Sequence, residues 1–216
     1  MSLLSSLFVQ KRPSYSDKVW MTQRAALKGM MTDGLQALTQ SEVPIVVSWF
    51  ADKRQEVVDF VTANQVPYRI VDADTSSVAN QDGSVLLLDA QWLNKYSQAP
   101  EFLRKQYATS RVHFLFYGHY PIPARESQLV EKISAADKAT IITFFSSLDD
   151  RAFQMFGAEN IKSLMEKMGL KEDEAVEHAM VSKAMERARE KIAGTISTEI
   201  ITSTETGWYQ QNYKQK

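Results

Sequence analysis

The sequence predicts an α/β protein: a three-layer sandwich around a mostly parallel sheet, followed by a C-terminal helical appendage. Apolar, β-branched runs of strand length alternate with helical patterns between about residues 44 and 148, which is typical of βαβ units with right-handed crossovers. The runs are continuous rather than alternating, as expected for strands that helices cover on both faces. No strand pattern follows residue 148, so the rest of the chain is expected to be helical.

The first helical pattern runs from Ser16 to about Thr39, and we expect Ser16 or Asp17 to cap its start. Its apolar residues fall on one helical face, and they are Trp20, Leu27, Met31, Leu35 and Leu38. The run PIVVSWF, which begins at Pro44, is the first expected strand of the sheet.

Four further strands are predicted by short apolar runs, at residues 68–73, 85–90, 112–117 and 140–145. The helix that begins at Ala51 has Asp52 and Gln55 at capping-box spacing. A mixed helical stretch covers residues 92–107, and another helix follows Pro123.

Residues 149–168 are predicted to form one or two short helices that end at Gly169. Residues 171–174, KEDE, place three acids in the first turn of a new helix, where the helix dipole favours them. That helix has an apolar face, places Arg189 on its polar face and ends at Gly194; its apolar residues are Val181, Ala184, Met185, Ala188 and Ile192. We therefore expect three units: residues 1–148, 149–194 and a flexible or docking tail, 195–216.

The composition excludes several classes of function. A net charge of -1 gives no overall field for nucleic acid or an anionic membrane, so no nucleic-acid partner is expected. Cysteine is absent, which excludes disulfides and cysteine-ligated metal sites. No run approaches the roughly 20 apolar residues of a membrane span. The N-terminal MSLLSSLFVQKRP carries its charges after its apolar run, unlike a secretory signal. We expect a cytoplasmic protein.

One stretch resembles a known family. Residues 156–192 contain FG, then MGLKEDEAVEH, then a helix with V-x-K-A followed by A-x-x-x-I. They resemble the SecA family, the ATPase motor of protein export, in which an IFG motif leads to a helical pair, an L-G-M…I-E-H segment and a V-x-K-A-I helix. Residues 147–150, SLDD, and 17–22, DKVWMT, are similar to the SLEDD and D-x-V-Y-K-T segments of that family.

The resemblance implies a RecA-like (P-loop NTPase-like) second nucleotide-binding domain and the first turns of the helical scaffold. It also implies a link to protein export, with a protein partner that could be the export motor itself. The resemblance does not extend to the family's first nucleotide-binding domain, preprotein cross-linking domain, helical wing or zinc-binding tail.

The departures from the family predict that this domain is degenerate. No G-x-x-x-x-G-K-[ST] loop, which would cradle phosphates, occurs in the chain. The family's arginine-finger helix, aligned without a gap from Phe156, falls on residues 128–138, and its arginines are replaced by Val130, Lys132 and Ala135. A lysine lacks the planar fork of a guanidinium for bidentate phosphate contact. We therefore expect no motor chemistry, no catalytic residues and no cofactor.

Four basic residues are candidates for a phosphate-binding remnant if their loops meet at one sheet edge: Lys53, Arg54, Arg125 and Lys132. The alternative is ordinary solvated charge. Three aromatic residues near the C-terminus are either a partner anchor or a device that docks the tail on its own domain: Trp208, Tyr209 and Tyr213.

Acids and histidines offer weaker candidates. Three acids lie where predicted strands end, a common ligand position that is also typical of structural caps: Asp72, Asp74 and Asp89. The histidines, His113, His119 and His178, are far apart in sequence and form no metal-binding motif, so no metal site is predicted. We expect His178 to pack between helices.

Three hypotheses follow. The first is a non-catalytic SecA-like interaction or regulatory module linked to protein export. The second is a regulatory domain that binds a nucleotide or phosphate without hydrolysis. The third is an enzyme with a site among the strand-end acids.

Overall fold

The computed structural model describes residues 15–71, 83–95, 110–136, 140–167 and 169–213. The strands of these residues form one parallel sheet in the order β1-β6-β5-β2-β4-β3. They are β1 (Ser16–Trp20), β2 (Val43–Ser48), β3 (Tyr68–Val71), β4 (Val85–Asp89), β5 (Val112–Tyr117) and β6 (Ile141–Ser147). The predicted α/β class with a parallel sheet is confirmed.

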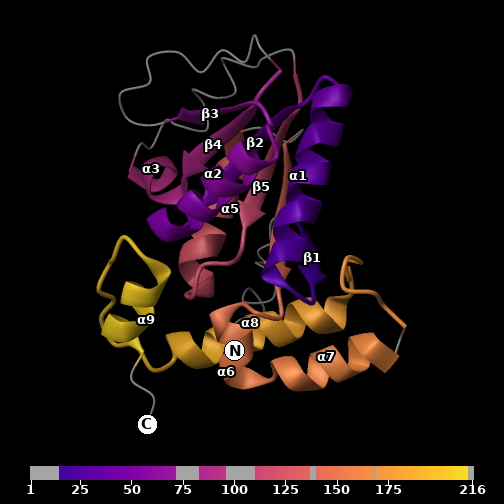
Figure 1. The fold of residues 1–216 in the computed structure, drawn as a ribbon. Coiled ribbons are helices and arrows are strands. Elements are labelled where there is room, and N and C mark those ends of the chain that lie inside the picture. Colours follow the sequence, from indigo (N-terminus) through magenta and orange to yellow (C-terminus); the bar gives the residue numbers. More distant parts are fainter. Residues whose placement is uncertain (1–14, 72–82, 96–109, 137–139, 168, 214–216) are drawn as a thin grey trace, which may run out of the picture.

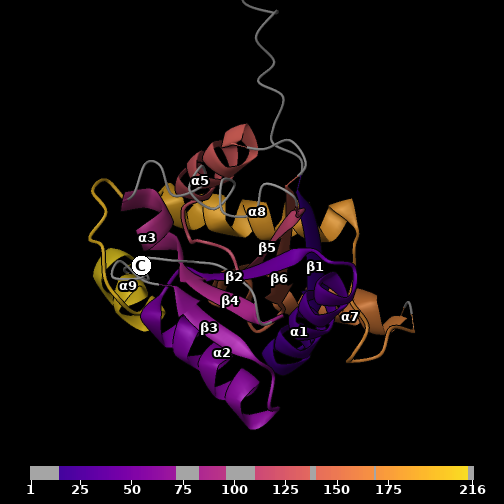
Figure 2. The same ribbon diagram turned by 90° about the horizontal axis from the view of Figure 1, so that it is seen from above.

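Helices cover both faces of the sheet. Figure 2 shows α1 (Gln23–Thr39) and α2 (Ala51–Ala63) on one face, and α3 (Ala90–Lys95) and α5 (Pro123–Ala136) on the other. Each face has its own apolar cluster. The first includes Met30, Val57 and Leu87, and the second includes Leu129 and Phe116. Strands β2, β4, β5 and β6 are buried on both faces, which explains why their sequences are continuously apolar.

The C-terminal helices gather at the end of the sheet where the strands finish (Figure 1). They are α6 (Arg151–Phe156), α7 (Ala158–Lys167), α8 (Ala179–Ala193) and α9 (Glu205–Asn212). Gly157, at φ +130°, separates α6 from α7, and Gly169, at φ +75°, follows α7 as predicted. Both the helix α8 and the tail contribute buried residues to the same cluster as the sheet, among them Ile192 and Trp208. The three-unit division of the chain stays a prediction.

The prediction that a helix begins at Ser16 was wrong. Residues Ser16–Trp20 form the edge strand β1, paired with β6, and α1 begins only at Gln23, where the Thr22 side chain accepts from Ala25 N. Trp20 lies in the same apolar cluster as Leu27, but it reaches that cluster from a strand. The seven-residue interval between Trp20 and Leu27 matches helical spacing by coincidence, and this explains the wrong prediction.

Leu35 was assigned wrongly to the buried face of α1. Its exposed fraction is 41%, whereas Met30, which the pattern omitted, is completely buried. The predicted capping box of α2 is also absent: the N-cap is Phe50, without a side-chain hydrogen bond, and Gln55 donates to Asp59 instead.

The helix predicted from residues 171–174 begins later. Val176 and Val19 exchange two backbone hydrogen bonds, of 3.1 and 2.8 Å, as an isolated antiparallel bridge on the outer edge of β1. This pairing holds the segment extended, so α8 starts at Ala179. His178 is exposed and caps that helix by accepting from Met180 N, so the expectation that it packs between helices was wrong.

The mixed helical stretch is confirmed only as α3, because residues 96–107 lie outside the described part. Within the part of the chain that the structure describes, no helix combines the length and apolarity needed to cross a membrane.

Candidate functional site

The carboxyl ends of β2 and β5 meet at the topological switch point of the sheet. From β2 the chain first moves outward to β3 and β4, and then returns to β5 on the other side of β2. Ligands of open α/β sheets bind in the crevice outside such strand ends. Here the crevice is walled by Trp49 and Phe50 after β2, by Gly118 and His119 after β5, and by Asp150 after β6.

The chain fills this crevice with its own helix α9. Trp208 and Tyr209 are 0% and 4% exposed, and the Trp208 ring packs edge-on against Tyr120 at 6.1 Å. Ala51 N, in the first turn of α2, donates to the Ser203 carbonyl at 2.8 Å. The cavity that remains has a volume of about 30 Å³, which is the space of one or two water molecules. This remaining cavity is too small for a nucleotide.

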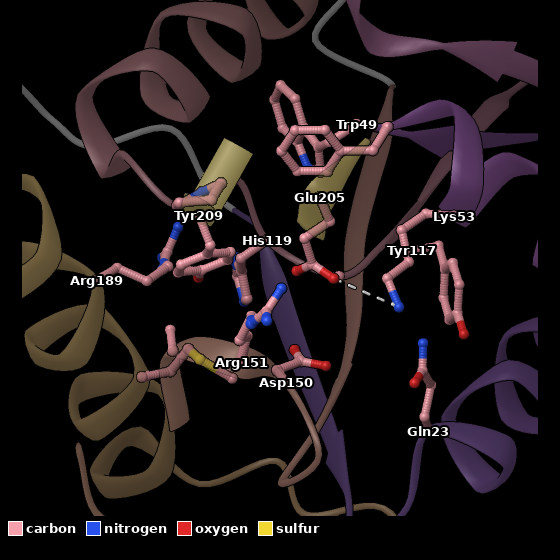
Figure 3. A pocket seen from close by; sticks show the side chains of 15 residues that line it. Gln23, Trp49, Lys53, Tyr117, His119, Asp150, Arg151, Arg189, Glu205 and Tyr209 are labelled. Atoms are coloured by element: carbon pink, nitrogen blue, oxygen red, sulfur yellow. Dashed lines mark ion pairs between the residues drawn. The ribbon is translucent and has the colours of Figure 1, made fainter. Parts of the chain in front are cut away.

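Lys53 and Glu205 face one another across this cavity, from α2 and α9 respectively (Figure 3). Lys53 Nζ lies 3.5 Å from a Glu205 oxygen and 3.0 Å from Glu56. The Asp52 carboxylate accepts from the Glu205 backbone N–H at 3.1 Å. The pair therefore joins the start of α2 to the start of α9.

In the cavity, burial and neighbouring charges shift the pKa values of the ionisable side chains in opposite directions. Burial raises the pKa of Glu205 to about 6, although Lys53 acts in the opposite direction. Burial likewise raises the pKa of Asp150, against the influence of His119 and Lys53. For Lys53, burial alone would lower the pKa, but Glu205 and Glu56 outweigh it and the pKa is raised. Lys53 thus stays charged and is neutralised by acids of its own chain.

A buried ionic cluster lies behind the cavity and joins three elements. Arg189 of α8 donates to Glu126 of α5 at 2.8 Å, and His119 Nδ1 lies 3.1 Å from the same carboxylate. His119 Nε2 lies 3.4 Å from Asp17 of β1. Glu126 also accepts from Tyr120 N at 2.9 Å. The side chains of Arg189, Glu126 and His119 are at most 4% exposed.

The charges of this cluster stabilise one another. Burial alone would lower the pKa of His119, but Glu126 and Asp17 raise it to about 9. Burial would raise the pKa values of Glu126 and Asp17, but Arg189 and His119 hold them below their usual range. His119 therefore lies as an imidazolium between two carboxylates, stacked on Phe144 at 4.5 Å. This arrangement ties α8 to the sheet rather than offering a free acid or base.

The four predicted basic residues do not form one patch. Lys53 lines the filled crevice, whereas Arg54 and Arg125 line a separate cleft. Arg54 lies 3.9 Å from Asp89, and Arg125 lies 3.2 Å from Glu199. Lys132 Nζ approaches the carbonyl oxygens of Leu93 and Asn94 at 3.4 and 3.5 Å. A phosphate-binding role for these residues stays a prediction.

The cleft has a volume of about 740 Å³ and lies outside the ends of β2, β3 and β4. Aromatic side chains, Trp49, Trp92 and Tyr120, line it together with the two arginines. This size and lining are typical of small-molecule sites.

Of the three strand-end acids, only Asp89 lies among the described residues, so a site among these acids stays a prediction. Asp89 caps α3 by accepting from Gln91 N at 2.6 Å, and Asp72 and Asp74 lie outside the described residues. No group of three or more histidine and acidic side chains suited to a metal ion occurs in the described ranges.

The predicted tail aromatics dock on their own domain. Trp208 Nε1 donates to Glu199 at 2.8 Å, Tyr209 lies under Arg151, and Tyr213 contacts the Phe156 ring at 6.3 Å. A further role as a partner anchor stays a prediction.

Sequence reasoning missed Arg189, Glu126, Glu199 and Glu205. Arg189 follows the buried Ala188 and looks like part of a charged helix face, and the acids stand in polar surroundings. Only the packing of α8 and the tail on the strand ends brings them together.

Comparisons with known proteins find similarity to the protein translocase subunit SecA. The chain is 22% identical over 192 residues to the protein translocase subunit SecA of Desulfotalea psychrophila, a match that covers 85% of this chain and 22% of that protein. It is 52% identical over 52 residues to SecA of Clostridium beijerinckii, covering 24% of this chain and 6% of that protein. The chain thus spans less than a quarter of the length of these relatives.

No protein-family model matches the chain. Among solved structures, the C-terminal part of the Fun30 ATPase domain matches at 13% identity and a TM-score of 0.38. The match covers 80% of this chain and 54% of the Fun30 chain, and the similarity is too low to bear on function. The chain is therefore similar to part of SecA, at low identity over most of its length and at high identity over a short segment.

Proposed function

We propose that this chain is a non-catalytic interaction or regulatory module of protein translocation, derived from the second RecA-like nucleotide-binding domain of a SecA-like protein and the start of its helical scaffold. The similarity to SecA supports the link to translocation. The module acts by contact with a protein partner, for which the export motor is the first candidate.

One observation carries the non-catalytic part of the proposal. The crevice between the ends of β2, β5 and β6 is filled by α9, and the space of about 30 Å³ that remains in it is far below the 300–1,000 Å³ of typical ligand pockets. The positions aligned with the family's arginine fingers agree with this role. Val130 is completely buried in the apolar core, where it cannot reach a phosphate.

The test is a binding measurement with full-length SecA from the same organism. On size-exclusion chromatography with light scattering, we expect the chain and SecA to elute together. We also expect the chain alone to hydrolyse ATP no faster than buffer. A chain that fails to bind SecA, with and without nucleotide, refutes the link. ATP hydrolysis that persists through purification refutes the non-catalytic assignment.

The cleft favours a second candidate function, regulation by a bound nucleotide or phosphate without hydrolysis. Arg54 and Arg125 both line this space of about 740 Å³ at the ends of the strands. Their side chains are 33% and 55% exposed, and their acidic partners leave guanidinium donors for a phosphate.

A thermal-shift titration distinguishes the two candidates. If the second is correct, ATP, ADP or inorganic phosphate should raise the Tm with saturation at micromolar concentration, and the pair Arg54→Ala and Arg125→Ala should abolish the shift. Arg187→Ala, at an exposed position of α8, is the matched control. An unchanged Tm up to millimolar ligand contradicts this second candidate.

A further inference from the structure

The tail that fills the crevice has a defined chemistry. Thr204 caps helix α9 through its hydroxyl, which accepts from Gly207 N at 3.1 Å, and Glu205 lies in the first turn of the helix. One turn later come Trp208 and Tyr209, both buried. An isolated helix of this length is not stable in water. The helical form of residues 205–212 therefore depends on the surface on which it lies.

That surface, which we term the α9 groove, consists of Asp52, Lys53, Tyr120, Arg125 and Arg151. It receives the tail through complementary charge: Lys53 pairs with Glu205, and Arg125 pairs with Glu199 at 3.2 Å. Apolar complementarity adds to this, because Tyr120 packs on Trp208 and Arg151 lies over the Tyr209 ring at 5.2 Å.

The tail is attached in a way that permits release. The segment from Gly194 to α9 runs over the surface, and its Ile200 and Ile201 side chains are 50% and 64% exposed. Docking also places the Glu205 carboxylate where burial opposes its charge. Within residues 195–213, Trp208 and Tyr209 are the only buried residues, so the tail can open locally without unfolding the sheet.

We propose that the α9 groove is a docking site for a partner protein, and that the partner supplies a helical segment with a carboxylate one turn before an aromatic pair. Helix α9 occupies the groove when the partner is absent and exchanges with it. This mode is helix-in-groove recognition, with the internal segment as a tethered competitor. The inference rests on the proposed function as an interaction module.

The test uses full-length chains and a fluorescein-labelled peptide of residues 195–216. In fluorescence anisotropy, the variant Glu205→Lys should bind this peptide at least about tenfold more tightly than the unchanged chain, because its own tail is repelled by Lys53 and no longer competes at a millimolar effective concentration. Glu190→Lys, an equal charge change at an exposed position of α8, should bind like the unchanged chain.

A charge exchange tests where the peptide binds. The chain with Lys53→Glu should take only the peptide that carries Glu205→Lys, whereas the chain with both substitutions re-forms its internal pair and should take neither peptide. Circular dichroism and thermal melting establish that each variant is folded. Should Glu205→Lys fail to fold, Trp208→Ala replaces it with the same expected direction, because it removes the ring that packs against Tyr120 and so weakens docking of the internal tail. Equal affinities of all folded variants for both peptides overturn the proposal.

A competition step separates a peptide site from an anion site. Inorganic phosphate and ATP, at matched ionic strength, should not displace the peptide from the Glu205→Lys chain. Saturable displacement at micromolar concentration overturns the proposal in favour of an anion site. Binding to SecA without peptide exchange refutes this inference alone, and peptide exchange without SecA binding refutes the proposed function alone.

Discussion

Arg189 Nη1 donates to Glu126 Oε1 at 2.8 Å, and both side chains are 4% exposed where α8 crosses α5. The same guanidinium nitrogen also donates to the Tyr120 carbonyl at 3.1 Å. This pair fastens the C-terminal helices to the sheet, and it lies directly behind the cavity that α9 closes.

Removing one partner of the Arg189–Glu126 pair should lower the free energy of unfolding strongly. Arg189→Met leaves the Glu126 charge buried with only His119 as an ionic partner, so the free energy of unfolding should fall by about 3–5 kcal/mol. Arg189→Met with Glu126→Gln should cost less than the two single changes added together, because the two sites are coupled. Urea unfolding followed by circular dichroism measures both. Arg187→Met, exposed on the same helix, is the control, and a loss no greater than that of the control contradicts the buried ion pair.

Stability should fall at alkaline pH because of His119. Its pKa is about 9 in the folded chain and 6.5 as a free side chain, so the stabilisation is complete below pH 6.5 and is lost as the pH rises through about 9. The loss is up to about 3 kcal/mol. Urea unfolding between pH 6 and pH 9.5 should show this slope, and His119→Gln should flatten it. His113→Gln is the control, because burial lowers the pKa of His113 below its ordinary value, so this residue does not titrate near pH 9. An equal slope in His119→Gln would falsify the assignment.

Docking of α9 should weaken as the pH rises through about 6. The folded pKa of Glu205 is raised above its ordinary 4.5, so the protonated form favours docking, and ionisation between pH 4.5 and about 6 opposes it. The difference is up to about 2 kcal/mol. The Ala51 amide, which donates to Ser203, reports this through hydrogen exchange corrected for the intrinsic rate. Glu205→Gln should reduce the pH dependence of this exchange and leave only the part that is due to Asp150. Glu190→Gln should leave the pH dependence unchanged. The opposite sign, with protection rising toward pH 7, contradicts this account.

A methyl group at Gly29 should destabilise the contact between α1 and β1. A Cβ there would lie 2.2 Å from the Trp20 ring, so the indole or the helix must shift. Gly29→Ala should cost about 1–3 kcal/mol through overpacking, although alanine favours helix by about 1 kcal/mol. Gly29→Ala combined with Trp20→Leu should recover part of the loss. A more stable Gly29→Ala chain in thermal melting would show that Trp20 has room to move.

The sequence alone determined the α/β class, the central strands and a short helical region that ends at Gly169. Their signals are local: continuous apolar runs mark strands buried on both faces, and glycine marks left-handed backbone after a helix. The edge strand β1 was not predicted, because its pairing partner β6 lies more than a hundred residues away and Trp20 imitated helical spacing.

The motifs also indicated the similarity to SecA and the absence of a phosphate-binding loop. The candidate site, in contrast, was decided by tertiary structure. Nothing in the spacing of Lys53, Arg125, Glu199 and Glu205 shows that they pair, and nothing marks Arg189 as buried. Long-range packing of the tail across the strand ends determines both. Charge pairing of this kind depends on distance in space, and sequence patterns record only distance along the chain.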